Sequence, residues 1–330
     1  MLRCAAVVCL VLAHVAAYGL WAVSPGGGTW YACNAYNSLC RMCIPVFVMV
    51  SGAMLLPRDA PMWRYVRRAV LTLLVWGTAY IVIITTPWMG GDGDYSPIAI
   101  ALHMIQKPDH LWFLYMIGGL YLITPILRQI ARDRRTTGYF LILWFAFCII
   151  LPTLSCAPKL HRFLPSLMAN IGLEGIGLYS GYFILGQMLA GPAGDRYDRL
   201  GLSLFLAGVF MTFGLTMACQ LLTGHYISSF NECSSLNVCI SGVGGFLMFR
   251  RRFKYAQLPA TLARAVNVVA VSTMGVYILH YPLTLVALRH GFRLLEGGWV
   301  PIPLFALTIG LTSLALALII KRIPLLGKLF

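Results

Sequence analysis

Acidic side chains are scarce in this sequence. Asp and Glu together number 10 of 330 residues, against 25 Lys and Arg, and charged residues of both signs make up only 11%. Hydrophobic residues make up 59%, and the mean hydropathy is +0.80. Soluble globular domains carry about twice this share of charge. The composition therefore excludes an ordinary soluble protein and places the chain in a membrane.

The few carboxylates are also absent from the middle of every long apolar segment. Carboxylates inside the membrane commonly form the proton relays of pumps and transporters, so their absence argues against a proton-coupled pump. The chain likewise lacks a soluble basic module with interleaved aromatic residues. Its net charge of +15 therefore does not indicate a nucleic-acid partner, and it suits anionic membrane lipid instead.

About ten apolar segments are long enough to cross a bilayer, which needs roughly 20 mostly apolar residues. They cover approximately 3–23, 38–57, 67–88, 110–130, 138–156, 175–191, 200–222, 235–250, 262–288 and 302–320. Most of the Lys and Arg residues lie in the termini and in the linkers 57–68, 128–137, 191–199 and 250–264. The positive-inside rule therefore predicts that both termini are cytoplasmic. We expect an all-α integral membrane protein with one polytopic domain over residues 1–330, in the inner or plasma membrane of the cell.

The apolar opening MLRCAAVVCLVLAH, followed by HVAAYG, has a second interpretation as a cleaved signal peptide. A histidine at position 14 weakens an apolar run of that kind, and nine further spans follow. We therefore expect a retained first helix.

Ten cysteines do not form the framework of a metal site. Cys40 and Cys43 make a C-x-x-C pair, but no second pair of Cys or His accompanies it, so we expect no zinc and no other metal. Cys33, Cys156 and Cys233 are predicted on the outer side. A disulfide between two of them is compatible with an oxidising compartment.

Arg3 and His14 lie eleven residues apart in the first span. Eleven residues of α-helix rise about 16.5 Å and turn about 1,100°, within roughly 20° of three full turns. The two side chains are therefore predicted to share one face, with Arg3 at the cytoplasmic interface and His14 halfway across. A ligand whose anionic end meets Arg3 could bring its reactive end to His14. The alternatives are an arginine that only snorkels and a histidine that only bonds a neighbouring helix.

Four further residues are predicted toward the outer side of the membrane. Arg41 lies near the outer end of the second span, His110 and Trp112 begin the fourth, and His280 lies in the outer half of the ninth. A buried guanidinium needs a partner or an anionic or polyhydroxyl ligand. An aromatic belt at the interface is an adequate alternative for Trp112. In the second span, Gly52 predicts the close approach of another helix.

Four motifs follow one another along the chain. They are Arg-x10-His in the first span, R-x3-P-x-F-x-M-x-S-G in the second, HLWFL with YLITPIL in the fourth, and MGVYILHYPL in the ninth. Together they resemble the acyltransferase-3 family of integral membrane O-acyltransferases. The compact chain, without an extracytoplasmic esterase-like domain, is similar to the type that O-acetylates enterobacterial common antigen. Only Met1 and Leu2 precede Arg3, which is fewer residues than relatives usually carry.

The resemblance implies transfer of an acyl group, commonly acetyl from acetyl-CoA, to a hydroxyl of a glycan or lipid-linked saccharide. Arg3 matches the donor-side arginine of the family, and His14 matches its essential histidine. Independently, a sugar hydroxyl is a weak nucleophile near pH 7, and a neutral imidazole suits the role of its base. Whether His14 acts as a base or carries the acyl group itself stays open.

The remaining polar residues are candidates for holding the acceptor or stabilising the developing oxyanion. They are Arg41, His110, Trp112 and His280. Glu174, at the start of the sixth span, is the nearest carboxylate that could orient a histidine, although a solvated loop acid explains it too. A secondary transporter or exporter of a polar or lipid-linked glycan is the competing hypothesis, because it would also use a polar path between helices. A membrane scaffold ranks below both, since it leaves the paired Arg3 and His14 unexplained.

Overall fold

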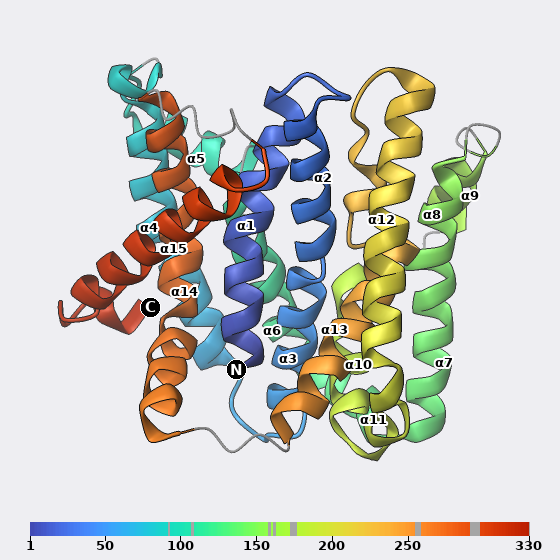
Figure 1. Cartoon of the computed structure of the whole chain (residues 1–330). Helices are drawn as coiled ribbons and strands as arrows, with labels where there is room; N and C mark the ends of the chain where they lie inside the picture. The colour runs from blue at the N-terminus through green and yellow to red at the C-terminus, as the bar shows by residue number, and fades with distance from the viewer. Residues whose placement is uncertain are drawn as a thin grey trace.

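The computed structural model of the chain is a bundle of helices (Figure 1). It describes residues 1–91, 93–106, 109–157, 160, 163–171, 177–254, 259–290 and 298–329. All regular elements within these ranges are helical, and none is a strand. Nine candidate spans in the described chain are long and apolar enough to cross a membrane. The predicted all-α membrane class is confirmed.

The long helices alternate with short connecting ones. The α-helices are α1 (Leu2–Ala22), α2 (Gly28–Cys40), α3 (Cys43–Leu55), α4 (Trp63–Thr85), α5 (Pro97–Gln106), α6 (Trp112–Arg132), α7 (Arg134–Trp144), α8 (Leu151–Ser155), α9 (Leu164–Ile171), α10 (Leu178–Ala190), α11 (Pro192–Tyr197), α12 (Gly201–Thr223), α13 (Leu236–Lys254), α14 (Ala260–Arg289) and α15 (Pro301–Ile320). Shorter elements are η1 (Pro87–Met89), η2 (Asp109–Leu111), the π-helical η3 (Phe145–Ile150), η5 (Asp198–Leu200), η6 (Ser228–Asn231) and η7 (Leu326–Leu329).

The second span differs from its prediction, because it begins ten residues earlier than residue 38 and runs from Gly28 to Leu55 as α2 and α3. Its first half is polar, which hid it in the sequence. The amides of Asn34 and Asn37 are buried, and Asn37 donates to Asn231 Oδ1 at 2.8 Å. Because neighbouring helices satisfy these groups, a polar helix is stable inside the bundle. Arg41 consequently caps α2 near the middle of this span, not near its outer end as predicted.

The sixth predicted span, 175–191, corresponds to α10, whose 13 residues are fewer than the roughly 20 that cross a bilayer. Residues 172–176, directly before it, lie outside the described residues. Helix α10 packs closely against α3. A Cβ added at Gly52 would overlap the carbonyl of Phe183, and one at Gly186 would overlap the backbone of Met49. The close approach predicted at Gly52 is thus confirmed.

Two clusters of buried apolar side chains form the interior. One contains Leu10, Val11 and residues of α4, α14 and α15, and the other contains Met49, Phe183 and residues of α6, α7 and α13. Cys9, Ile44, Phe47 and Phe113 pack against both clusters. All ten cysteines are free, so the disulfide considered above is not formed.

The linkers alternate between the two ends of the bundle (Figure 1). Those that follow α1, α4 and α12 lie at one end, whereas the linker after α3, the short helix α11 and the N-terminus lie at the other. The lysine- and arginine-rich linkers belong to the second group. That this end is the cytoplasmic one stays a prediction from the positive-inside rule.

Candidate active site

A cavity of about 550 Å³ lies where the two apolar clusters meet. Its walls come from α1, α3, α4, α6, α14 and the segment after α15. Ile44, Phe47 and Phe113, which pack against both clusters, line it. A volume of this size is typical of a site for a small molecule or cofactor.

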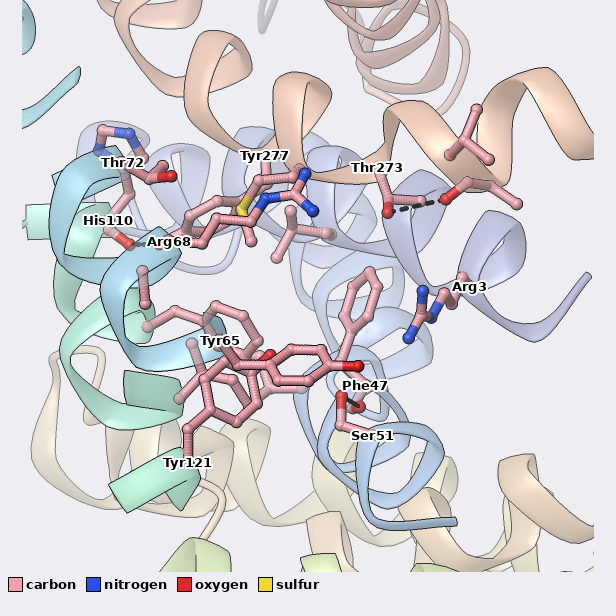
Figure 2. A pocket seen from close by; sticks show the side chains of 18 of the residues that line it. Arg3, Phe47, Ser51, Tyr65, Arg68, Thr72, His110, Tyr121, Thr273 and Tyr277 are labelled. Carbon is pink, nitrogen blue, oxygen red and sulfur yellow. Dashed lines mark hydrogen bonds between the residues drawn. The ribbon is translucent and has the colours of Figure 1, made fainter. Parts of the chain in front are cut away.

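Arg3 and His14 both line this cavity. Helix α1 is unbroken from Leu2 to Ala22, so it carries both side chains on the face that α3, α4 and α14 surround. Arg3 donates weakly to Met54 Sδ at 3.3 Å. Figure 2 shows the guanidinium groups of Arg3 and Arg68 turned toward the same space, with Tyr65 and Phe47 along one wall. The cavity therefore joins a cation at one end of α1 to an imidazole three turns further on.

Two more cations lie at the Arg3 end. Arg68 and Lys321 line the cavity, and the charges of Arg3 and Arg68 both act on the phenol of Tyr121. Lys321 Nζ donates to the carbonyl of Val271 at 2.6 Å. Burial and the nearby charge of Arg68 lower the pKa of Lys321 below its ordinary value. Among the described lining residues none is acidic, so this end suits an anion.

Sequence reasoning missed Arg68 and Lys321 because it assigned all the basic residues beside the spans to lipid anchoring. The available signal was their position, since Arg68 lies in the second turn of α4 and Lys321 directly follows α15. Only packing shows that these helix ends meet beside Arg3.

Three histidines gather at the other end of the cavity. The ring centroids of His14 and His280 are 4.9 Å apart, and those of His110 and His280 are 5.9 Å apart. His110 lines the cavity, whereas His280 is completely buried behind it. The hydroxyl of Tyr277 donates to the His110 carbonyl, and His110 Nε2 lies 3.3 Å from the carbonyl of Ile278. Helix α14 thus fixes η2 and brings its own histidine beside α1.

Arg41 does not line the cavity but lies close behind this histidine cluster. Its charge acts on both His14 and Cys233, and its guanidinium bonds the hydroxyl of Tyr226. Burial raises the pKa of Tyr226, and the Arg41 charge partly opposes that shift. The Nε of Arg41 is buried without a hydrogen-bond partner in the described chain.

Of the two remaining predicted residues, Trp112 is part of the cavity wall and Glu174 is not among the described residues. Trp112 lines the cavity, with its ring centroid 5.7 Å from that of Tyr179. Within the described chain, no group of three or more His, Cys, Asp or Glu side chains could hold a metal ion.

The bundle has an internal cavity that is basic at one end and lined by histidines at the other. This arrangement is that of a membrane protein able to hold an anionic ligand beside a base. The family model for acyltransferase 3, described as an acyltransferase domain, matches residues 1–322. The chain therefore belongs to the acyltransferase-3 family and is a membrane acyltransferase. No curated protein and no solved structure matches it. Membership favours the enzyme over the transporter and the scaffold, while the type specific for enterobacterial common antigen stays a prediction.

Proposed function

We propose that this protein transfers an acyl group, in the simplest case acetyl, from acetyl-CoA to a hydroxyl of a cell-surface glycan or lipid-linked saccharide. The donor enters from the side predicted to be cytoplasmic. The observation that carries the proposal is one continuous cavity lined by Arg3 at one end and His14 at the other. By the family match, the group moved is an acyl group.

The charges at the Arg3 end support acyl-CoA as the donor. Coenzyme A carries a diphosphate and a 3′-phosphate, and Arg3, Arg68 and Lys321 supply three cations. Guanidinium groups bind phosphate oxygens in pairs, and an ammonium group binds them as a point charge. No described carboxylate in the lining competes with an anionic ligand for these cations.

The chemistry needs a base at the far end of the cavity. In direct transfer, His14 accepts the proton of the acceptor hydroxyl as its oxygen attacks the thioester carbonyl carbon. The carbon–sulfur bond then breaks, and His14 returns the proton to the departing sulfur. In the covalent alternative, a His14 nitrogen attacks the thioester carbonyl carbon, the carbon–sulfur bond breaks, and CoA leaves as its thiolate. The acceptor hydroxyl oxygen then attacks the acyl carbon, the carbon–nitrogen bond to His14 breaks, and the hydroxyl proton goes to the CoA thiolate. Both routes require one bare nitrogen on His14 facing the cavity.

The acceptor side is assigned to the remaining candidates. His110 and Trp112 line the same cavity, and an indole or imidazole ring suits the face of a sugar. Arg41 and Glu174 are proposed to act on the acceptor as well, and the buried Nε of Arg41 has no hydrogen-bond partner in the described chain. A saccharide hydroxyl or a lipid-linked phosphate would supply the acceptor that such a guanidinium needs.

The proposal is tested with purified protein and acetyl-CoA labelled in the acetyl group. We expect His14→Ala to lower release of CoA thiol by at least about 100-fold while the elution volume and thermal midpoint stay those of the wild type. His290→Ala is the matched control, because His290 stacks on Trp88 at 4.1 Å outside the cavity. Equal rates in wild type and His14→Ala would refute the assignment. Mass spectrometry of surface glycans, with and without the protein, then identifies the acceptor by an added acetyl mass.

A further inference from the structure

We propose that His280 is a positioning residue for His14, and that it accepts a hydrogen bond from the His14 ring through its own Nε2. This proposal rests on the proposed function, since it explains how His14 is held ready for acyl transfer. It replaces the acceptor-binding role predicted for His280 with a role behind the reacting histidine.

The tautomer of His280 follows from its backbone contacts. Its Nδ1 lies 2.6 Å from the carbonyl of Tyr277 and 3.1 Å from the carbonyl of Val276. Carbonyl oxygens only accept hydrogen bonds, so Nδ1 must carry the hydrogen. In a neutral imidazole the second nitrogen is then bare. The structure thus assigns His280 Nε2 as a hydrogen-bond acceptor.

This bare nitrogen has no partner. His280 is completely buried, and its Nε2 has no hydrogen-bond partner within the described residues. An unpaired buried acceptor is destabilising, particularly where no water reaches it. A donor is therefore expected beside it.

His14 is the nearest ring that can provide the donor. The two ring centroids are 4.9 Å apart, and an N–H···N bond of normal length places imidazole centroids about 5 Å apart. Since His280 Nε2 has no partner in the described chain, the bond requires the His14 ring to rotate about its own side-chain bonds.

Neighbouring groups are less suited to the same bond. His110 directs its Nε2 to the Ile278 carbonyl, which leaves its Nδ1 bare and unable to donate. Its ring is stacked on Tyr281 at 4.6 Å. The Tyr277 hydroxyl is already bonded to the His110 carbonyl. Among the described residues, the titratable and charged groups around the pair His14 and His280 are Arg41, Tyr80, Asp109, His110, Tyr277 and Tyr281.

Among the described residues, the carboxylate that directly precedes His110 is that of Asp109, and it is bonded elsewhere. It accepts a hydrogen bond from the hydroxyl of Tyr80 at 2.7 Å. In the Ser-His-Asp arrangement a carboxylate fixes the tautomer of the base and stabilises it once it is protonated. A neutral imidazole acceptor can also fix the tautomer of His14. It stabilises protonated His14 through a hydrogen bond that strengthens when His14 becomes positively charged.

The consequence for His14 is a fixed orientation. Its bonded nitrogen points to His280, away from the cavity, and its other nitrogen is bare and faces the donor. That state serves both the direct and the covalent route. Because His280 does not line the cavity, it acts only through His14 and should not change donor binding.

Three substitutions at His280 separate positioning from a structural role. A Gln oxygen can reach the Nε2 position and accept the bond, an Asn amide can replace only the Nδ1 contacts to the carbonyls, and Leu replaces neither. We expect His280→Leu and His280→Asn to lower kcat by about 100-fold or more, and His280→Gln to recover at least a tenth of the wild-type kcat. KM for acetyl-CoA stays unchanged in all three. Recovery by Asn and not by Gln would overturn the proposal.

A second readout does not depend on acyl transfer. Diethyl pyrocarbonate modifies bare imidazole nitrogens, and mass spectrometry of the first-span peptide measures its rate at His14 between pH 5 and 8. We expect the pH dependence to shift in His280→Leu and to return toward wild type in His280→Gln, with His290→Ala as the control. Should Leu prevent folding, the Gln and Asn variants carry the comparison. Identical profiles in every variant would refute the pairing, whereas shifted profiles without acyl transfer would refute only the proposed function.

Discussion

Replacing Arg3 by Ala is expected to weaken the use of acetyl-CoA without unfolding the bundle. The guanidinium has one weak contact, to Met54 Sδ at 3.3 Å, and no described carboxylate lines its end of the cavity. Its removal therefore strands no buried partner, and the stability should change by less than about 0.5 kcal/mol. A hydrogen bond between charged groups contributes about 1.5–3 kcal/mol. At roughly 1.4 kcal/mol per tenfold, KM for acetyl-CoA should rise by about 10- to 150-fold.

The assay measures released CoA thiol at several donor and salt concentrations. Arg3→Lys should fall between wild type and Ala, because an ammonium keeps the charge but not the two-pronged contact. Acetyl-dephospho-CoA lacks the 3′-phosphate and so distinguishes this group from the diphosphate. If Arg3 binds the 3′-phosphate, Arg3→Ala should have little further effect on KM for this donor. Arg135→Ala, at an exposed position outside the cavity, is the control for lost charge. An unchanged KM in Arg3→Ala, or an equal rise in Arg135→Ala, would refute the reasoning.

Three further results are expected. Lys321→Met should raise KM for acetyl-CoA. Because burial and the Arg68 charge lower the pKa of Lys321, wild-type affinity for the donor should begin to fall at a lower pH than an ordinary lysine would give. Measuring KM at increasing pH checks this, and the variant should not show the loss. Gly52→Ala should destabilise the protein by about 1–3 kcal/mol, because the added Cβ would overlap the backbone of α10. At Gly138 an added Cβ meets no atom within 4 Å, so Gly138→Ala should be neutral or stabilising. A thermal-shift measurement compares the two variants. Asp133 accepts hydrogen bonds from the hydroxyl and the amide of Thr136, in the first turn of α7, and these bonds lower its pKa. Asp133→Ala should therefore speed amide exchange at residues 134–137. In wild type the same change should appear as pH falls through that lowered pKa, so variant and wild type should converge at low pH.

The relation between Arg3 and His14 was predictable because it depends on one helix. Helical rotation fixes the face that two residues share, and no knowledge of neighbouring helices is needed. The long apolar spans were predictable for a similar reason. Each forms its backbone hydrogen bonds within one helix, and its high hydropathy is visible in the sequence. The roles of both residues stay predictions.

Features that depend on contacts between helices were not predictable. Helix α2 is polar, and its amides bond η6 and α12, which hydropathy does not reveal. The second span was therefore placed ten residues late and Arg41 too near its end. Lys321 joins the basic end of the cavity only because the segment after α15 packs beside α4. The unpaired Nε2 of His280 could not be foreseen, because its lack of a partner in the described chain depends on which side chains of neighbouring helices reach it.

The second span consists of two helices, α2 and α3, which make different specific contacts. Its first half is tied by Asn37 to Asn231, and its second half is locked against α10 at Gly52. The break at Arg41 and Met42 therefore lies between two helices that share α1 as a neighbour but are held by different hydrogen bonds and close contacts. A tilt of α2 could be absorbed at this break while α3, which carries Phe47 and Ser51 of the cavity wall, stays in place.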